Sequence, residues 1–180
     1  MKYTQTLRGE AMTKNEINNM FSRCDNSQLK AIMSVLLMTG GRISEVLMIK
    51  GKDISSDDEH IYFNCYILKK RNGIERMQKK IKKTHEYYVY FKDWINQNNF
   101  KEENLIFSYS RKYVWKIIKI IGPESTPHLF RHTVATYLGK HMDVFTLQKW
   151  MNWSKLEMAS RYVHPTNVIN AGTDALEKAF

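Results

Sequence analysis

Apolar residues recur at helical spacing along most of this 180-residue chain. Residues 13–23 begin with Thr-Lys-Asn-Glu, a capping box that opens a helix. Residues 111–121 place apolar side chains between basic ones, as an amphipathic helix does, and a Gly-Pro pair ends the run. Cap and stop residues mark the other helices that we expect, at about residues 27–39, 42–49, 85–96, 126–139 and 144–151, with Ser27 as the cap of the first of these.

One region departs from this helical pattern. Residues 61–67 alternate between the two faces of a strand and are rich in β-branched and aromatic side chains. Arg71-Asn72-Gly73 supplies a turn, because Asn-Gly favours a tight hairpin, and residues 74–81 return as a second strand. The pattern therefore predicts a mainly α-helical domain with a small antiparallel β-sheet, an α+β fold.

The chain divides into three expected parts. Residues 1–12 form an N-terminal arm, residues 13–166 a single domain and residues 167–180 a tail helix, and the length suits one domain. The N-terminus lacks the apolar run of a signal peptide, and no stretch approaches the roughly 18 continuous apolar residues of a membrane span. We therefore expect a soluble, cytoplasmic protein without a membrane partner.

The net charge of the chain indicates the kind of partner that it binds. Lys and Arg number 28 against 18 Asp and Glu, a net charge of +10, and the densest basic run lies at residues 69–83. Such an excess favours a polyanionic partner, although a basic protein without one stays possible. Cys24 and Cys65 stand alone, without CxxC spacing, which is typical of reduced thiols rather than of a disulfide or a metal site.

The strongest chemical signal lies at residues 126–138. Thr126 can cap a helix, and Pro127 suits its first position, where no amide hydrogen is missed. His128 and Arg131 then lie three residues apart on one face, near the positive end of the helix dipole. That face offers an anion two donors and the field of the helix.

Two further stretches fit around this one. Upstream, the run Thr-Gly-Gly-Arg-Ile-Ser-Glu-Val-Leu contains Arg42, which can pair with Glu45 and aim its remaining donors at a phosphate. Downstream, Tyr162 follows Trp153 by nine residues. Ser154-Lys155-Leu156-Glu157 is a second capping box, which predicts a short helix that carries Tyr162 and ends at Pro165. The ordered set of TGxRxSE, HxxRHxxAT and a tryptophan nine residues before a tyrosine resembles the catalytic domain of the tyrosine recombinases, the phage-type integrases and Xer-type recombinases. The resemblance extends over roughly residues 13–164.

This resemblance implies a site-specific DNA recombinase, or integrase, that cuts and rejoins DNA through a 3′-phosphotyrosyl intermediate. Negative charge gathers on the phosphate oxygens in the transition state, which calls for preorganised donors. A tryptophan stands where the family more often has a histidine, and its indole N–H can donate a hydrogen bond but cannot shuttle a proton. The catalytic set implied is Arg42, Lys70, His128, Arg131, Trp153 and the nucleophile Tyr162, with no cofactor and no metal. In this set His128 assists the attacking hydroxyl or holds the phosphate.

The predicted hairpin would carry the lysine that protonates the leaving 5′-oxygen. It lacks the Gly-Lys-Gly shape usual in the family, so Lys69, Lys70 and Arg71 compete for this role, and we choose Lys70. Other basic residues of the hairpin are expected to contact the DNA backbone: Lys69, Arg71, Arg76 and Lys79.

His132 has a different expected role. With His128, four residues earlier, it could supply half of a zinc site, but no third ligand of suitable spacing follows. We therefore interpret His132 as a packed or capping residue.

The partners implied by the resemblance are double-stranded DNA and further copies of the chain, as a tetramer on paired DNA sites. The tail at residues 167–180 is expected to dock on a neighbouring protomer. Members of the family usually carry an additional N-terminal DNA-clamping domain, and here only residues 1–12 precede the first expected helix. Other functions remain open: a non-cutting DNA-binding protein of this fold, a type IB topoisomerase-like strand cutter, or a basic domain for RNA or a membrane surface.

Overall fold

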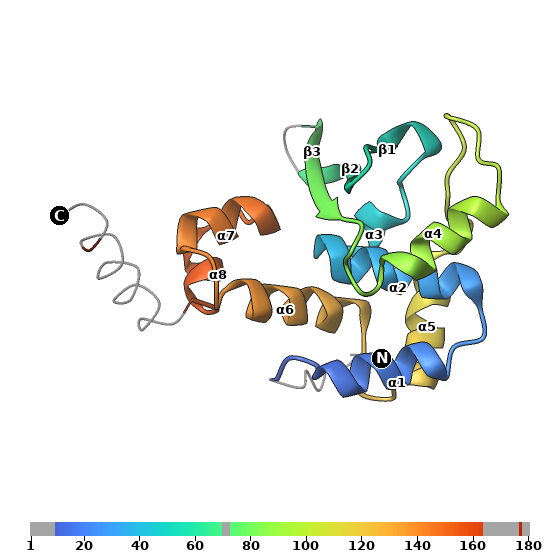
Figure 1. Ribbon diagram of the computed structural model, residues 1–180. Coiled ribbons are helices and arrows are strands. Elements are labelled where there is room, and N and C mark those ends of the chain that lie inside the picture. Colours follow the sequence, from blue (N-terminus) through green and yellow to red (C-terminus); the bar gives the residue numbers. More distant parts are fainter. Residues whose placement is uncertain (1–9, 70–72, 164–176, 178–180) are drawn as a thin grey trace.

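The structure is a computed structural model, which describes residues 10–69, 73–163 and 177. In that part of the chain, a small sheet lies at one edge of a group of helices (Figure 1). The elements follow in the order α1 (Lys14–Ser22), α2 (Ser27–Thr39), α3 (Ile43–Val46), η1 (Gly51–Asp53), β1 (Ile54–Ser56), β2 (His60–Lys69), β3 (Gly73–Lys82), α4 (Tyr88–Gln97), α5 (Arg111–Ile121), α6 (Pro127–Leu138), α7 (Val144–Met151) and α8 (Leu156–Ser160).

Helix α2 forms the centre of the domain. All of its residues from Ala31 to Thr39 are buried, including Ser34, whose hydroxyl donates to the carbonyl of Tyr87. A helix that is apolar on nearly all sides must be covered on all sides. Helices α4 and α6 pack directly against it, and α3 follows its end at Gly40.

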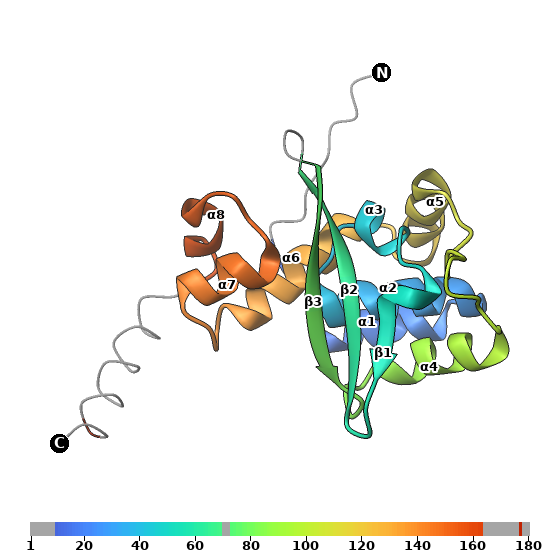
Figure 2. The same cartoon turned by 90° about the horizontal axis from the view of Figure 1, so that it is seen from above.

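The sheet is antiparallel, with strand order β1-β2-β3. Strands β2 and β3 pair from His60 opposite Lys82 to Lys69 opposite Gly73, so they form one long hairpin. Figure 2 shows this hairpin between two groups of helices, with α7 and α8 on one side and α4 and α5 on the other. The predicted α+β fold, mainly helical with a small antiparallel sheet, is confirmed.

Local capping signals were mostly confirmed. Thr13 and Glu16 form the predicted capping box, and the side chains of Thr126 and Asp143 accept amide hydrogens at the starts of α6 and α7. Asn26, rather than the predicted Ser27, caps α2. Its amide oxygen reaches the backbone N–H of Leu29 at 2.8 Å.

Other boundaries differ from the prediction. Helix α3 is shorter than residues 42–49, α4 begins at Tyr88 rather than at residue 85, and the short strand β1 was not predicted. The expected capping box at Ser154 is absent, because α8 begins after Lys155 without a side-chain cap. Tyr162 therefore follows α8 instead of lying on it.

The ends of the chain are described only in part. Met12, expected in a loose arm, is buried, and its backbone N–H donates to the hydroxyl of Thr133 on α6 at 3.0 Å. The packed domain thus begins before residue 13. The tail at residues 167–180, apart from residue 177, lies outside the described residues.

Candidate active site

Helix α6 carries the first site residues. Thr126 caps it, Pro127 is its first residue, and its buried face packs against α2. The sequence predicted this helix because its cap, its first-turn proline and its apolar positions all agree. Arg131 and His132 lie near its middle and reach toward two different neighbours.

Arg131 is buried, with 5% of its surface exposed. Its Nη1 donates to the carbonyl of Gly40 at 2.6 Å, and its Nη2 donates to the carbonyl of Met151. Gly40 ends α2 in a left-handed conformation at φ 63°, which glycine adopts without strain. Burial, and then the nearby charge of Arg42, lower the pKa of Arg131 to about 10, so it stays a cation at neutral pH.

Arg42 lies at the surface, with 43% of its side chain exposed. Its Nη1 donates to Oε1 of Glu45 at 2.8 Å, and its backbone N–H donates to Oε2 of the same carboxylate at 2.8 Å. Glu45 is buried, so its carboxylate holds the guanidinium of Arg42 from the protein side. The predicted pairing of Arg42 with Glu45 is confirmed.

Tyr162 lies two residues beyond α8, and its ring contacts other aromatic rings. Its phenol ring stacks on Trp153, with 5.2 Å between ring centroids and 15° between ring planes. Trp153 is buried, and the guanidinium carbon of Arg131 lies 5.6 Å from the centre of its ring. Tyr162, Trp153 and Arg131 thus form one contiguous cluster, from sequence positions up to 31 residues apart.

The hydroxyl of Tyr162 has a partner that the sequence did not predict. Its Oη lies 3.0 Å from Nδ1 of His132, which the sequence had suggested was a packed or capping residue. Burial raises the pKa of Tyr162, although the charges of Arg131 and Arg161 oppose that effect. The phenol is therefore protonated at neutral pH, and a ring nitrogen that accepts or donates according to its tautomer lies beside it. The only signal in the sequence was the position of His132 directly after Arg131.

His128 is exposed at the first turn of α6. The protein around it lowers its pKa by reducing its solvation, and the positive charges of Arg131, His132 and Arg42 lower it further. These effects show that His128 shares a positive environment with both arginines. The structure thus brings together Arg42, His128, Arg131, Trp153 and Tyr162.

A glycine sets the position of the tyrosine backbone. A Cβ on Gly139, just after α6, would collide with the carbonyl of Tyr162. Gly139 has an ordinary helical conformation, with φ −63°, so the requirement here is for space and not for an unusual backbone angle. Gly139 therefore allows the segment after α8 to lie against the end of α6.

The hairpin residues divide into three groups. Lys70 and Arg71, as well as the side chain of Lys69, lie outside the described part of the structure. Arg76 is exposed, with its guanidinium carbon 5.1 Å from the centre of the Tyr66 ring. Lys79, by contrast, is only 5% exposed, which does not agree with its predicted role as a surface DNA contact.

Side chains alternate between the two faces of a strand, and Lys79 lies on the same face of β3 as the buried Ile81. Its side chain therefore points into the protein. Its Nζ donates to the carbonyl of Trp150 and lies 4.3 Å from the centre of the Trp150 ring. Burial lowers its pKa to about 7. Trp150 and Met151 are the last two residues of α7, so this helix end receives a cation from Lys79 and another from Arg131.

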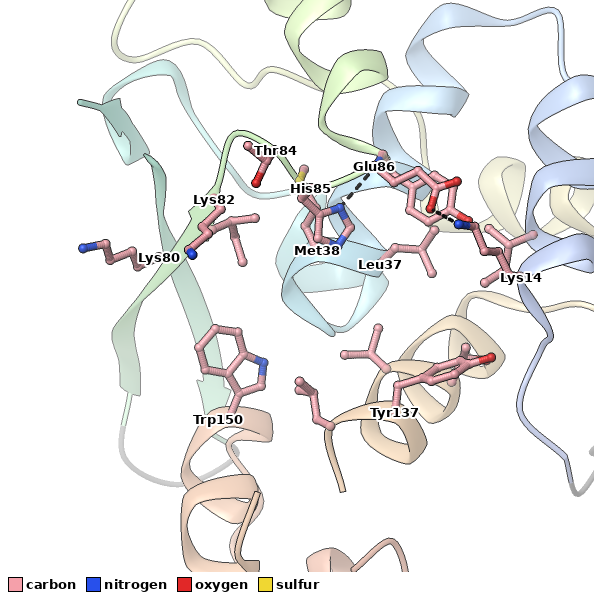
Figure 3. Close-up of a pocket in the computed structure, with 16 residues that line it drawn as sticks. Lys14, Leu37, Met38, Lys80, Lys82, Thr84, His85, Glu86, Tyr137 and Trp150 are labelled. Carbon is pink, nitrogen blue, oxygen red and sulfur yellow. Dashed lines mark hydrogen bonds and ion pairs between the residues drawn. The ribbon is translucent and has the colours of Figure 1, made fainter. Parts of the chain in front are cut away.

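A separate cavity of about 610 Å³ lies between β3, the loop before α4, and helices α2, α6 and α7 (Figure 3). Its walls are mainly apolar and include Met38, Tyr137 and the indole of Trp150. An ion pair between Lys14 and Glu86, at 2.9 Å, lies at one edge. The arginines and Tyr162 do not line this cavity, so it is distinct from the cluster around the tyrosine.

No group of three or more His, Cys, Asp or Glu side chains in the described residues is placed to hold a metal ion. Among the same residues, no helix has the length and apolar character that crossing a membrane requires.

Known proteins resemble this chain in sequence and in fold. The sequence profile of the phage integrase family matches residues 10–168. Tyrosine recombinase XerA of Saccharolobus solfataricus is 27% identical over 158 residues, which cover 86% of this chain and 52% of that protein. The chain thus spans about half the length of this curated relative.

Two solved structures show the same fold. The XerH site-specific recombinase bound to difH substrate, in a pre-cleavage complex, has a TM-score of 0.66 and 18% identity, over 89% of this chain and 52% of that chain. The catalytic domain of bacteriophage HP1 integrase has a TM-score of 0.60 and 19% identity, over 91% of this chain and 93% of that chain. The profile match extends over most of the sequence, and the chain belongs to the phage integrase family.

Proposed function

We propose that this chain is the catalytic domain of a site-specific DNA recombinase, which cuts and rejoins DNA through a 3′-phosphotyrosyl bond at Tyr162. The observation that carries the proposal is a cluster of three side chains. Tyr162 stacks on Trp153, and the guanidinium of Arg131 lies over the Trp153 ring. A phenol placed beside a fixed cation, in a member of the phage integrase family, suits nucleophilic attack on a phosphodiester.

Arg42 and Arg131 supply the positive charge for the phosphate in this proposal. Both are permanently charged planar forks, which match the oxygens of a phosphate. Each terminal nitrogen of a guanidinium carries two hydrogens, so Arg131 can hold Gly40 and Met151 and still donate to phosphate. Its carbonyl bonds fix the guanidinium before DNA arrives, which is the condition for effective transition-state stabilisation.

The remaining roles follow from chemistry and position. His128, exposed beside both arginines, donates to a phosphate oxygen. Trp153 fixes the phenol ring by stacking. Lys70 protonates the leaving 5′-oxygen, while Lys69, Arg71 and Arg76 contact the DNA backbone.

The partner in this proposal is double-stranded DNA, which the net charge of +10 favours. The chain acts as a homo-oligomer, a tetramer on paired sites, with residues 167–180 docked on a neighbouring protomer. Deleting residues 167–180 should then abolish complexes on paired sites and leave binding to one site intact. Unfolding of the truncated chain, measured by circular dichroism, would instead place the tail in the core.

The decisive experiment traps the covalent intermediate. The substrates are labelled duplexes with a single nick and randomised flanking sequence. After cleavage the short fragment with the free 5′-hydroxyl diffuses away, so religation is prevented and the labelled strand stays attached to the protein. The wild-type chain should give an adduct on a denaturing gel, and Tyr162→Phe should give none while binding DNA with similar affinity. Binding without any adduct in the wild type would favour the non-cutting DNA-binding alternative.

Tyr137→Phe is a matched control for this experiment. Tyr137 is exposed on α6, and its hydroxyl donates to the carbonyl of Met12 at 3.3 Å. This variant should form the adduct at the wild-type rate. An adduct that persists in Tyr162→Phe would place the nucleophile elsewhere.

A further inference from the structure

We propose that His132 is a catalytic residue that accepts the proton of Tyr162 during attack on the phosphate. The inference rests on the proposed function, because it assigns a role at the same site. The observation that carries it is the distance of 3.0 Å between Nδ1 of His132 and Oη of Tyr162. Their rings are tilted by 60°, with 5.3 Å between centroids, so the contact is formed edge to edge and not by stacking.

The direction of this hydrogen bond depends on the tautomer of His132, and the inference assigns the hydroxyl of Tyr162 as the donor. Burial raises the pKa of Tyr162, so its hydroxyl keeps its proton and can donate it. Nδ1 of His132 then accepts, which means that the ring proton is on Nε2. A protonated phenol is a weak nucleophile, and an adjacent base is one of the standard ways to activate it.

The other groups around the phenol are poor acceptors. Trp153 stacks on the ring, and its indole nitrogen is a donor only. Arg131 and Arg161, whose charges act on Tyr162, are cations. Within the described residues, His132 is the hydrogen-bond partner that the structure gives to the hydroxyl, whereas His128 lies one turn earlier on α6.

The proposed step balances in atoms and charge. The O–H bond of Tyr162 breaks, its proton moves to Nδ1 of His132, and Oη forms a bond to phosphorus as the P–O5′ bond breaks. The leaving 5′-oxygen takes its proton from a separate acid, the hairpin lysine of the proposed function. During religation the imidazolium of His132 returns its proton to the phenol oxygen. The negative charge of the phosphate stabilises that imidazolium among the cations of the site.

The first test is kinetic and uses the full chain. His132→Phe removes the acceptor and keeps an aromatic ring, so adduct formation at saturating nicked DNA should slow by about 10²–10⁴-fold, the scale of general base catalysis. The dissociation constant for DNA should stay within about twofold, because no phosphate contact is lost. An unchanged rate in this variant, with an active wild type, would overturn the inference and leave the proposed function standing.

A second variant separates proton transfer from positioning. Asparagine at residue 132 places an amide oxygen near the position of Nδ1, so it can hold the hydroxyl but cannot take its proton. His132→Asn should therefore remain slow, and its rate should rise with pH as the phenol ionises. Recovery of the wild-type rate would show that His132 only positions the tyrosine. His141→Asn, on the exposed residue just after α6, is the matched control and should keep the wild-type rate.

A third measurement does not depend on cleavage. Nitrogen-15 NMR of histidine-labelled protein reports which ring nitrogen of His132 carries the proton. The inference requires the Nε2–H form, with a change at Nδ1 in Tyr162→Phe. The opposite form would make His132 the donor and would overturn the inference. If the wild type formed no adduct, the proposed function would fail while this spectrum still decided the direction of the hydrogen bond.

Discussion

The two arginines of the site occupy opposite environments, although the same task was predicted for both. Arg131 is 5% exposed. Its guanidinium donates one hydrogen bond to each of two backbone carbonyls, at the ends of α2 and α7. Arg42 is exposed, with 43% of its side chain in solvent, and a single carboxylate holds it. The region around Arg131 is thus part of the core, and the region around Arg42 is an open surface.

A shared chemical role therefore does not imply a shared structural role. Arg131 connects three helices, because α6 carries it and its two acceptors follow or end α2 and α7. Arg42 connects only to its own turn through Glu45. We therefore expect mutations to separate stability from catalysis at one arginine and not at the other.

The largest effect is expected for Arg131→Ala. It should reduce adduct formation by about 10²–10³-fold, the scale for one lost transition-state donor. It should also lower the free energy of unfolding by about 2–5 kcal/mol, because two buried carbonyls lose their donor. Urea unfolding and single-turnover cleavage of the same preparation measure both. Full stability in this variant would contradict the description of Arg131 as part of the core.

Arg42→Ala should match that loss of cleavage and differ in stability. Adduct formation should fall by about 10²–10³-fold. The free energy of unfolding should fall by only about 1–2 kcal/mol, because the buried Glu45 loses one donor at Oε1 but keeps the backbone N–H of residue 42 at Oε2. A loss of several kcal/mol would mean that the two regions are not as different as their burial indicates.

Lys79 extends the comparison to pH, because it is a buried cation on β3. Below about pH 7 this lysine is protonated in the folded and the unfolded chain, so the cost of its burial is fully present. Between about 7 and its ordinary value of 10.5, the folded chain has lost the proton and the unfolded chain has kept it. The free energy of unfolding therefore rises with pH, by at most about 1.4 kcal/mol per pH unit.

Lys79→Met removes that pH dependence and keeps a side chain of similar length. The difference in unfolding free energy between wild type and variant should grow in favour of the wild type by about 1–3 kcal/mol from pH 7 to pH 9. Urea unfolding at the two pH values measures it. A difference that stays constant would show that the pKa of Lys79 is not lowered.

The smallest effect is expected for Arg76, which lies on β3 like Lys79 but is exposed. Arg76→Ala should weaken DNA binding slightly and reduce the slope of log affinity against log salt by about 1, the value for one phosphate contact. Lys79→Met should leave that slope unchanged, because the lysine is turned away from solvent. Equal slopes for both variants would break the distinction between exposed and buried cations.

The sequence predicted the local features of this site more fully than the distant ones. Thr126 caps α6, and Arg42 pairs with Glu45, because each contact depends on residues three apart in the chain. The contact of His132 with Tyr162 joins residues 30 apart, and that of Lys79 with Trp150 joins residues 71 apart. Helical periodicity and capping rules contain no information about such pairs, so the sequence did not predict the histidine beside the tyrosine or the buried lysine.

The failed cap at Ser154 has a related cause. Asn152 ends α7 in a left-handed conformation, and the N–H of Trp153 donates to the carbonyl of Gln148 at 3.0 Å. This turn directs Trp153 inward onto Tyr162, and α8 begins only after Lys155. Burial of the tryptophan thus outweighed a capping signal that contributes about 1 kcal/mol.

Both ends of the tyrosine lie against one helix and its end. The hydroxyl meets His132, and the backbone carbonyl meets Gly139, seven residues later. Two turns of helix, about 10 Å, therefore separate the two contacts of Tyr162. The same helix carries Arg131, so α6 both contacts the proposed nucleophile and holds a cation of the same cluster. An insertion in α6 between residues 132 and 139 should therefore disturb both contacts of the tyrosine at once.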